Sequence, residues 1–206
     1  MFLNLYTSQE LFHTAAPVLS THPLMSSLLR SLLLDNSYTA CTMGLTVLDR
    51  LLPIFAVHAC EQLKQLLPRL LAVLARVICW KERPLSNLRG SFTSVIQLDD
   101  IPPEVEDDIE RELEDDKPLH IRPDLSWEKL ESSFDAPVLS PPSPRALFRI
   151  LYYLFPRTTL RFLKEPAKCL VECGVVTTPY TVSWEEALDE INIRSRSEVR
   201  SLIQYD

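Results

Sequence analysis

Apolar side chains recur three or four residues apart through residues 8–82, in runs that prolines or polar residues separate. This spacing predicts helices over residues 9–19, 23–34, 38–52 and 57–81, and no alternating strand pattern occurs among them. We expect Pro23 to sit in the first turn of its helix and Pro53 to end the third helix. Short connections would make the helices antiparallel, either as a closed bundle or as the stacked pairs of an α-solenoid.

The helix expected over residues 57–81 has the most informative pattern. At about 100° per residue, its apolar side is wider than the seam of a two-stranded coiled coil, so we expect it to pack on more than one neighbour. Pro68 marks either a kink or a new first turn. The apolar side holds Leu63, Leu66, Leu67, Leu70, Leu71, Val73, Leu74, Val77 and Ile78, and the polar side holds Lys64, Gln65, Arg69 and Arg76.

The chain changes character at residue 85, where acidic clusters and prolines replace the helical pattern. Residues 98–135 hold fifteen acidic and four basic side chains, so the net charge of −7 conceals a mildly basic remainder. We therefore predict N-terminal helical repeats over 1–84, a mostly disordered insertion over 85–143, and a C-terminal helical part of the same structure over 144–206. A short acidic helix near 103–116 is an alternative within the insertion. Helical spacing returns over 144–155, 158–170, 184–190 and 195–203.

Composition narrows the classes of function. Three glycines in the whole chain leave no glycine-rich loop for a nucleotide phosphate. The five cysteines are an odd number and mostly lie in apolar helical patterns, which favours a reduced, cytoplasmic compartment. We predict no signal peptide and no membrane span, because the longest uncharged run, residues 11–29, contains prolines and histidines.

No catalytic, cofactor or metal site emerges from the side chains. Cys169 and Cys173 lack the second ligand pair that structural zinc requires. His58 and Cys60 lie near Asp49 without the local structure that activates a nucleophile. The acidic insertion offers no rigid pocket that would shift the pKa values of its carboxyl groups. We therefore predict a protein that is not an enzyme and uses no cofactor.

The positive side chains that follow the insertion form a candidate binding surface. At helical spacing four of them make a stripe beside the apolar residues Leu160, Leu163, Ala167 and Leu170, an arrangement typical of surfaces for anionic membranes or acidic partners. An ordinary solvent face on a core helix is the alternative, and Pro166 is expected to interrupt the stripe. No nucleic-acid motif accompanies these bases. They are Arg145, Arg149, Arg157, Arg161, Lys164 and Lys168.

Two Ser-Pro pairs give candidate phosphorylation sites at Ser140 and Ser143. A phosphate there would add negative charge beside Arg145. A plain proline-rich linker is the alternative interpretation.

An ordered series of segments resembles the N-terminal helical domain of hamartin, the scaffold subunit of the tuberous sclerosis complex, in a fungal-type form. Tyr153 stands where that family often has glycine, and the insertion has no counterpart. The resemblance covers about two-thirds of the chain. No single motif is diagnostic of the family, but the order of the segments along the chain is. The segments are 28–35 (LLRSLLLD), 44–48 (GLTVL), 51–54 (LLPI), 74–80 (LARVICW), 147–156 (LFRILYYLFP) and 162–164 (FLK), followed by a weaker match over 184–203.

The resemblance implies a HEAT-like α-solenoid and a scaffold role without catalysis. It implies a tuberin-like GTPase-activating subunit as partner, which acts on the small GTPase Rheb and restrains TOR signalling. A homodimer is a further assembly that we consider. It also implies recruitment to the periphery of lysosomal or vacuolar membranes through phosphoinositides. Because the first helices and the tuberin-binding coiled coil of the family have no counterpart here, we expect the sequence to be a fragment.

Overall fold

The computed structural model describes residues 10–35, 37–79, 120–125, 142–175 and 177–196. Within these ranges the backbone is mostly helical and contains no strand, so the all-α prediction is confirmed. An antiparallel bridge between Ile121 and Tyr180 is the only β-type pairing in the described part of the chain. The expected acidic helix near 103–116 lies outside the described residues.

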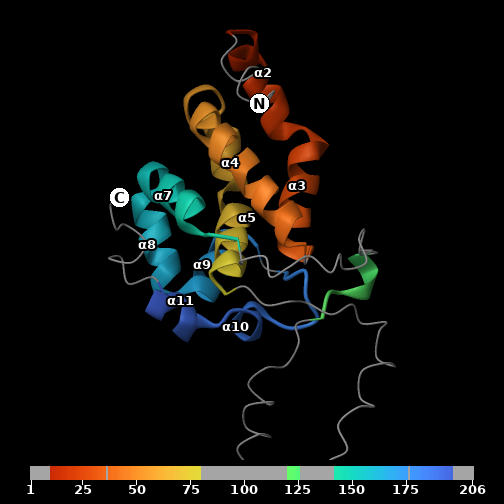
Figure 1. Ribbon diagram of the computed structural model, residues 1–206. Coiled ribbons are helices and arrows are strands. Elements are labelled where there is room, and N and C mark those ends of the chain that lie inside the picture. Colours follow the sequence, from red (N-terminus) through yellow and green to blue (C-terminus); the bar gives the residue numbers. More distant parts are fainter. Residues whose placement is uncertain (1–9, 36, 80–119, 126–141, 176, 197–206) are drawn as a thin grey trace, which may run out of the picture.

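The helices follow one another closely on each side of the insertion (Figure 1). Proline occupies the first turn of α3, α8 and α9, where its missing N–H costs no helical hydrogen bond. The side chain of Ser37 caps α4 by accepting a hydrogen bond from the Ala40 amide at 3.2 Å. The elements are α2 (Glu10–Thr21), α3 (Pro23–Leu34), α4 (Tyr38–His58), α5 (Cys60–Ile78), η2 (Pro123–Leu125), α7 (Arg145–Leu154), α8 (Pro156–Lys164), α9 (Pro166–Glu172), α10 (Trp184–Ala187) and α11 (Glu190–Arg196).

Helices from both sides of the insertion share one hydrophobic core. α4 contacts both α2 and α7, while α5 contacts α3, α4, α9 and α11. Successive helices also pack on each other, as in the pairs α3 with α4, α4 with α5, and α7 with α8. These contacts order six of the described helices into two rows, with α2, α4 and α7 in one and α3, α5 and α9 in the other, and α5 also contacts α2 across the rows.

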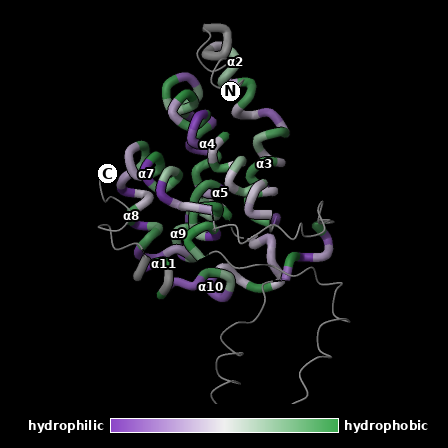
Figure 2. Tube along the Cα trace, viewed as in Figure 1, coloured by the Kyte–Doolittle hydropathy of each residue, from purple (hydrophilic) through white to green (hydrophobic). Residues whose placement is uncertain are grey.

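The second half of α5 is buried on every side. All nine residues from Leu70 to Ile78 are buried, whereas Lys64, Gln65 and Arg69 in the first half are exposed. Figure 2 shows the predominance of apolar residues along this central helix. α5 therefore packs on more than one neighbour, as predicted. In its second half these neighbours cover the whole helix surface.

Arg76 was expected on the polar side of this helix, and that prediction is wrong. Its side chain is only 2% exposed. The Nη1 atom donates a hydrogen bond to the Leu32 carbonyl at 2.7 Å, and Nη2 donates to the Asp35 carbonyl. These carbonyls lie at the C-terminal end of α3, where the last carbonyl groups have no N–H partner within the helix and the helix dipole favours a cation. The end of α3 thus gives a buried charge its hydrogen-bond partners.

Pro53 does not end its helix, contrary to the prediction, because α4 continues to His58. Proline removes one backbone hydrogen bond from a helix interior. Pro53 is itself exposed, while Leu52 and Phe55 on either side of it are fully buried in the core. Packing of the last turns of α4 holds them helical despite the proline.

Residues 120–125 lie within the predicted insertion and pack against the core. Ile121 is 5% exposed, and its neighbours exchange backbone hydrogen bonds with the segment around Tyr180: Thr181 donates to the His120 carbonyl and Arg122 to the Pro179 carbonyl. The hydroxyl of Tyr180 donates to the Leu33 carbonyl at 3.0 Å. This short part of the insertion therefore reaches the end of α3 through Tyr180.

Among the described residues α4 is the one helix whose length and apolar composition would allow it to cross a membrane. In its most apolar stretch 39% of the residues are buried, and the helix packs against α2, α3, α5 and α7. Core helices of water-soluble proteins have the same length and composition, so these properties do not indicate a localisation.

The hydrogen bonds of Arg76 give a test of this architecture. Replacing Arg76 with Ala is expected to lower the free energy of unfolding by about 2–4 kcal/mol, because charge-assisted hydrogen bonds are lost and a cavity is left. Arg76→Lys should fall between Ala and the native residue, since an ammonium group lacks the planar fork that reaches two carbonyls. Urea denaturation measures both. The control is Arg50→Ala, exposed on α4, which should change stability by less than about 0.5 kcal/mol. Equal stability of Arg76→Ala and Arg50→Ala would contradict the assignment.

Candidate functional site

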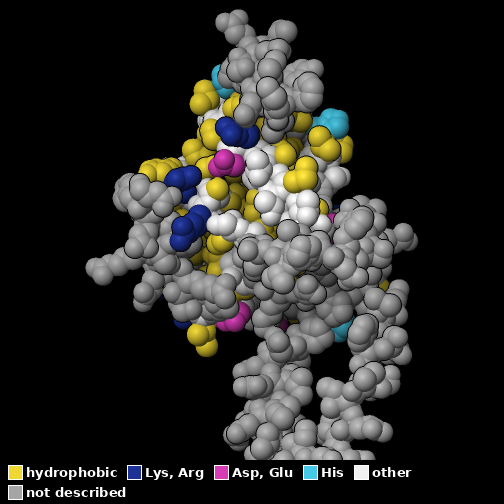
Figure 3. Space-filling view, in the orientation of Figure 1, with side chains coloured by type: hydrophobic (Ala, Val, Ile, Leu, Met, Phe, Trp, Pro, Cys, Tyr) yellow, Lys and Arg dark blue, Asp and Glu magenta, His cyan; other side chains and the backbone are white. Residues whose placement is uncertain are grey.

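The predicted basic residues are all exposed, but they lie on three helices rather than in one stripe. Arg145 and Arg149 are one turn apart on α7, and Arg157, Arg161 and Lys164 follow on α8. The chain leaves helical geometry at Glu165, and Pro166 starts α9, which carries Lys168. The interruption expected at Pro166 therefore occurs. In Figure 3, Lys and Arg side chains are visible over the region of α7 and also over α4. We call these six bases the basic surface.

The predicted apolar stripe of α8 and α9 is buried in part. Leu163, Ala167 and Leu170 lie in the core, with at most 6% of their surface exposed. Leu160 differs, because 44% of its surface is exposed. On α8 it lies on the same side as Arg157 and Lys164, since residues three and four apart share a helix face. Tyr153 at the end of α7 is 71% exposed. Apolar side chains thus accompany the bases at the surface.

Acidic neighbours neutralise part of the basic surface. Arg161 pairs with Glu172, and Lys168 pairs with Glu165 at 3.1 Å. The hydrogen bond from Lys168, together with its charge, lowers the pKa of the Glu165 carboxyl. Within the described part of the chain no salt bridge joins an acidic residue to the remaining four bases. Those four, Arg145, Arg149, Arg157 and Lys164, are the positive charges most available to a ligand.

The two predicted phosphorylation sites have different outcomes. Ser140 lies outside the described residues. Ser143 is exposed, and its hydroxyl accepts a hydrogen bond from the Arg145 amide at 3.4 Å, at the start of α7. A phosphate on Ser143 would lie near the positive end of the α7 dipole. Modification of either serine stays a prediction.

Two cysteine thiols are kept protonated by their surroundings. Burial raises the pKa of Cys169 to about 11, with a further contribution from neighbouring Cys173. Burial also raises the pKa of Cys41, and the nearby Arg76 charge offsets part of that effect. A reactive cysteine requires the opposite shift, toward the thiolate. The described residues also contain no group of three or more His, Cys, Asp or Glu side chains placed to hold a metal ion.

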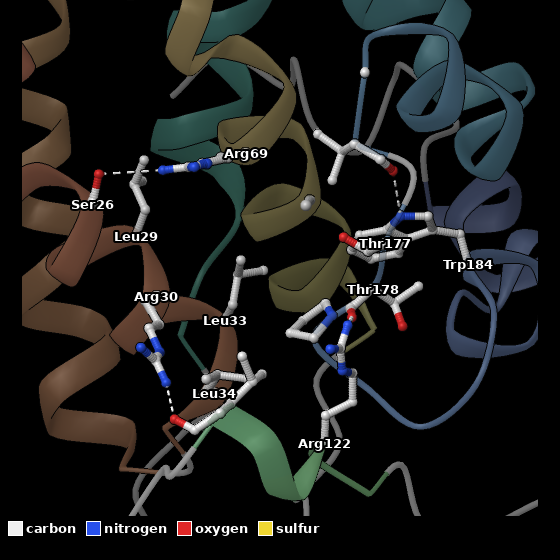
Figure 4. A pocket seen from close by; sticks show the side chains of 15 residues that line it. Ser26, Leu29, Arg30, Leu33, Leu34, Arg69, Arg122, Thr177, Thr178 and Trp184 are labelled. Carbon is white, nitrogen blue, oxygen red and sulfur yellow. Dashed lines mark hydrogen bonds between the residues drawn. The ribbon is translucent and has the colours of Figure 1, made fainter.

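A cleft of about 500 Å³, lined by fifteen described residues, was not predicted (Figure 4). We call it the arginine cleft, because Arg30 of α3, Arg69 of α5 and Arg122 line it together. Arg69 donates to the Ser26 hydroxyl at 3.3 Å, and Arg30 donates to the Leu125 carbonyl. Arg122 pairs with Asp124, with 2.9 Å between Nε and Oδ1.

The floor and one wall of the arginine cleft are apolar. Leu29, Leu33 and Leu34 contribute from α3. Trp184 lines the opposite side, and its Nε1 atom donates to the Val175 carbonyl at 2.8 Å, which fixes the indole ring. Nothing in the sequence relates these residues, because they come from helices and loops far apart along the chain. Only the folded contacts at the end of α3 bring them together.

Comparisons of the chain with protein-family models, with curated proteins and with solved structures found no match. The inference of function therefore depends on the residues themselves and on how the fold arranges them.

Thiol reactivity tests the environments of the cysteines. At pH 8 we expect a chromogenic disulfide reagent to react first with Cys60, which is exposed, and far more slowly with Cys41 and Cys169, which are buried and hold their protons. The rate at Cys169 should rise about tenfold per pH unit up to its pKa, as the thiolate fraction grows. A Cys60→Ser variant, the control, should lose the fast phase. Equal rates at Cys60 and Cys169 in the folded protein would show that this description of the α9 core is wrong.

Proposed function

We propose that the protein is a non-catalytic regulatory scaffold of the hamartin type. In this role it holds a tuberin-like GTPase-activating subunit, supports inactivation of the small GTPase Rheb and restrains TOR signalling. The observation that carries the proposal is the ordered series of hamartin-like segments, whose described residues lie on α3, α4, α5, α7 and α8 in chain order. The identity of the partner comes from that resemblance alone.

Most of these segments act in helix packing. Leu29, Leu32 and Leu34 of the first segment are buried, and Gly44 of the second faces Leu32 so closely that an added Cβ would lie 2.7 Å from its Cδ2 atom. Residues 74–78 of the fourth segment are buried at the C-terminal end of α5. Residues with such roles determine how helices approach each other, so the resemblance supports a shared architecture first and a shared partner second.

A HEAT-like α-solenoid is the architecture that we propose. In a solenoid, helix pairs stack so that each helix meets its counterpart in the next pair. The two rows of helices, α2 with α4 and α7, and α3 with α5 and α9, favour this arrangement. The raised pKa values of the buried thiols support a surface for binding rather than catalysis, as do Arg145, Arg149, Arg157 and Lys164, which are exposed and have no salt bridge within the described residues.

Binding to an anionic, phosphoinositide-containing membrane is the second candidate function. The observation that favours it is the exposure of Tyr153 and Leu160 beside Arg149, Arg157 and Lys164. Aromatic and aliphatic side chains enter the headgroup region while neighbouring bases attract anionic lipids. The corresponding location is the cytoplasmic periphery of lysosomal or vacuolar membranes.

Co-purification tests the scaffold proposal. The tagged chain is expected to enrich a tuberin-like subunit from extracts of its own cells, since this is the partner that the resemblance implies. A longer gene product with the coiled coil, if the genome encodes one, is purified in parallel as the positive control, because that segment makes the tuberin contact in the family. Absence of a tuberin-like subunit and of every TOR-pathway protein from both purifications would contradict the proposal.

Vesicle co-sedimentation tests the membrane function. Each base near an anionic surface contributes about 1 kcal/mol, so reversing Arg157 and Lys164 to Glu should weaken binding to phosphoinositide vesicles by tenfold or more. The matched control reverses Arg50 and Lys64, which are exposed on α4 and α5 and change the net charge by the same amount. Neutral vesicles should bind weakly in every case. Equal loss in both double variants, or equal binding to neutral and anionic vesicles, would exclude a specific membrane surface on α8.

A further inference from the structure

We propose that the arginine cleft is a binding site for a soluble organic anion, a phosphate- or carboxylate-bearing molecule with an apolar body. This inference goes beyond the scaffold role and does not depend on it. The cleft is also separate from the basic surface, because none of the six bases of that surface lines it. The charge, the floor and the size of the cleft each point to this class of ligand.

The charge of the lining is one-sided. Three of the fifteen lining residues are arginines, and none of the fifteen is acidic. Asp124 is outside the lining set, but it pairs with Arg122 through both carboxylate oxygens, so Arg122 adds little net charge to the cleft. Guanidinium groups present planar, paired donors that match carboxylate and phosphate oxygens. Arg69 has five N–H donors, and one of them donates to the Ser26 hydroxyl. This hydrogen bond orients the side chain and leaves the other donors for a ligand.

The apolar part of the lining excludes a bare inorganic ion as the best ligand. Leu29, Leu34 and Trp184 are at most 3% exposed, so they back the cleft without offering much surface to a ligand. The accessible apolar surface comes from the partly buried lining residues, among them Leu33, Leu125 and Val175. Covering such surface stabilises a complex by about 25 cal/mol per Å² of apolar area. A small anion such as phosphate covers none of it, whereas a molecule with a ring or a short aliphatic body does.

The dimensions agree with a small molecule. Sites for small ligands have volumes of about 300–1,000 Å³ and combine an apolar lining with a few placed polar groups. The volume of about 500 Å³ lies inside this range. A lipid headgroup is the other source of the same chemistry, but its acyl chains must remain in a bilayer, and the concave cleft is distinct from the helix faces that carry Tyr153 and Leu160. We therefore assign the cleft to a soluble ligand.

Calorimetric titration of the full chain with naphthyl phosphate tests the proposal. Naphthyl phosphate is expected to bind in a one-to-one complex. Naphthol, which has no charge, and inorganic phosphate, which has no apolar body, should each bind at least about tenfold more weakly, a difference of about 1.4 kcal/mol. Arg69→Ala should weaken binding of naphthyl phosphate by about tenfold, while Arg50→Ala, exposed on α4, should leave it unchanged. Urea midpoints for both variants verify that they fold.

Three results would overturn the inference. The first is the absence of saturable one-to-one binding. The second is equal affinity for naphthyl phosphate and naphthol, or for the native protein and a folded Arg69→Ala variant. The third separates the two sources of anion: if Arg69→Ala weakens phosphoinositide-vesicle binding as much as reversal of Arg157 and Lys164 does, the cleft serves lipid rather than a soluble ligand. None of these outcomes bears on tuberin co-purification, so the two proposals fail independently.

Discussion

A buried guanidinium at the end of a helix is the constraint on which the rest of this structure depends. The second half of α5 has no solvent face, so its one cation, Arg76, requires partners inside the core. The carbonyls of Leu32 and Asp35 supply them. Desolvating a charge costs several kcal/mol unless hydrogen bonds compensate it. The hydrogen bonds of Arg76 therefore join the buried half of α5 to the C-terminal end of α3.

Other parts of the chain meet at the same helix end. Tyr180 donates to the Leu33 carbonyl, and the segment that carries it pairs with residues 120–125. Arg30, one turn before the end of α3, reaches the Leu125 carbonyl. The walls of the arginine cleft are consequently set by the contacts that terminate α3. The basic surface, in contrast, lies on α7–α9, on the other side of the molecule from η2 in Figure 1.

The features that sequence could predict are those that depend on local spacing. The starts of α3 and α4 follow from Pro23 and the Ser37 cap, and the apolar side of α5 follows from its leucine spacing. The basic surface could be listed from the sequence because its residues are neighbours in the chain. The split at Glu165 also agrees with the local effect of Pro166.

What sequence could not predict depends on contacts between distant elements. Arg76 has the helical position of a polar-face residue, and only the placement of α3 buries it. Pro53 predicts a helix end from the sequence alone, but burial of Phe55 in the core keeps the following turn helical. Leu160 has the spacing of a core residue, but 44% of its surface is exposed. The arginine cleft combines α3, α5, residues 122–125 and the segments around Val175 and Trp184, a grouping that no local pattern contains.

The central claim is that α5, held by Arg76, organises the helices on both sides of the insertion into one cooperative core. Native-state hydrogen exchange tests this claim most directly, because amides that open only by global unfolding share one free energy of opening. The account predicts that the slowest amides of α3, α4, α5 and α7 exchange with the same free energy and the same denaturant dependence. Exchange of α7, α8 and α9 at a distinctly lower free energy, with α3–α5 still protected, would contradict it.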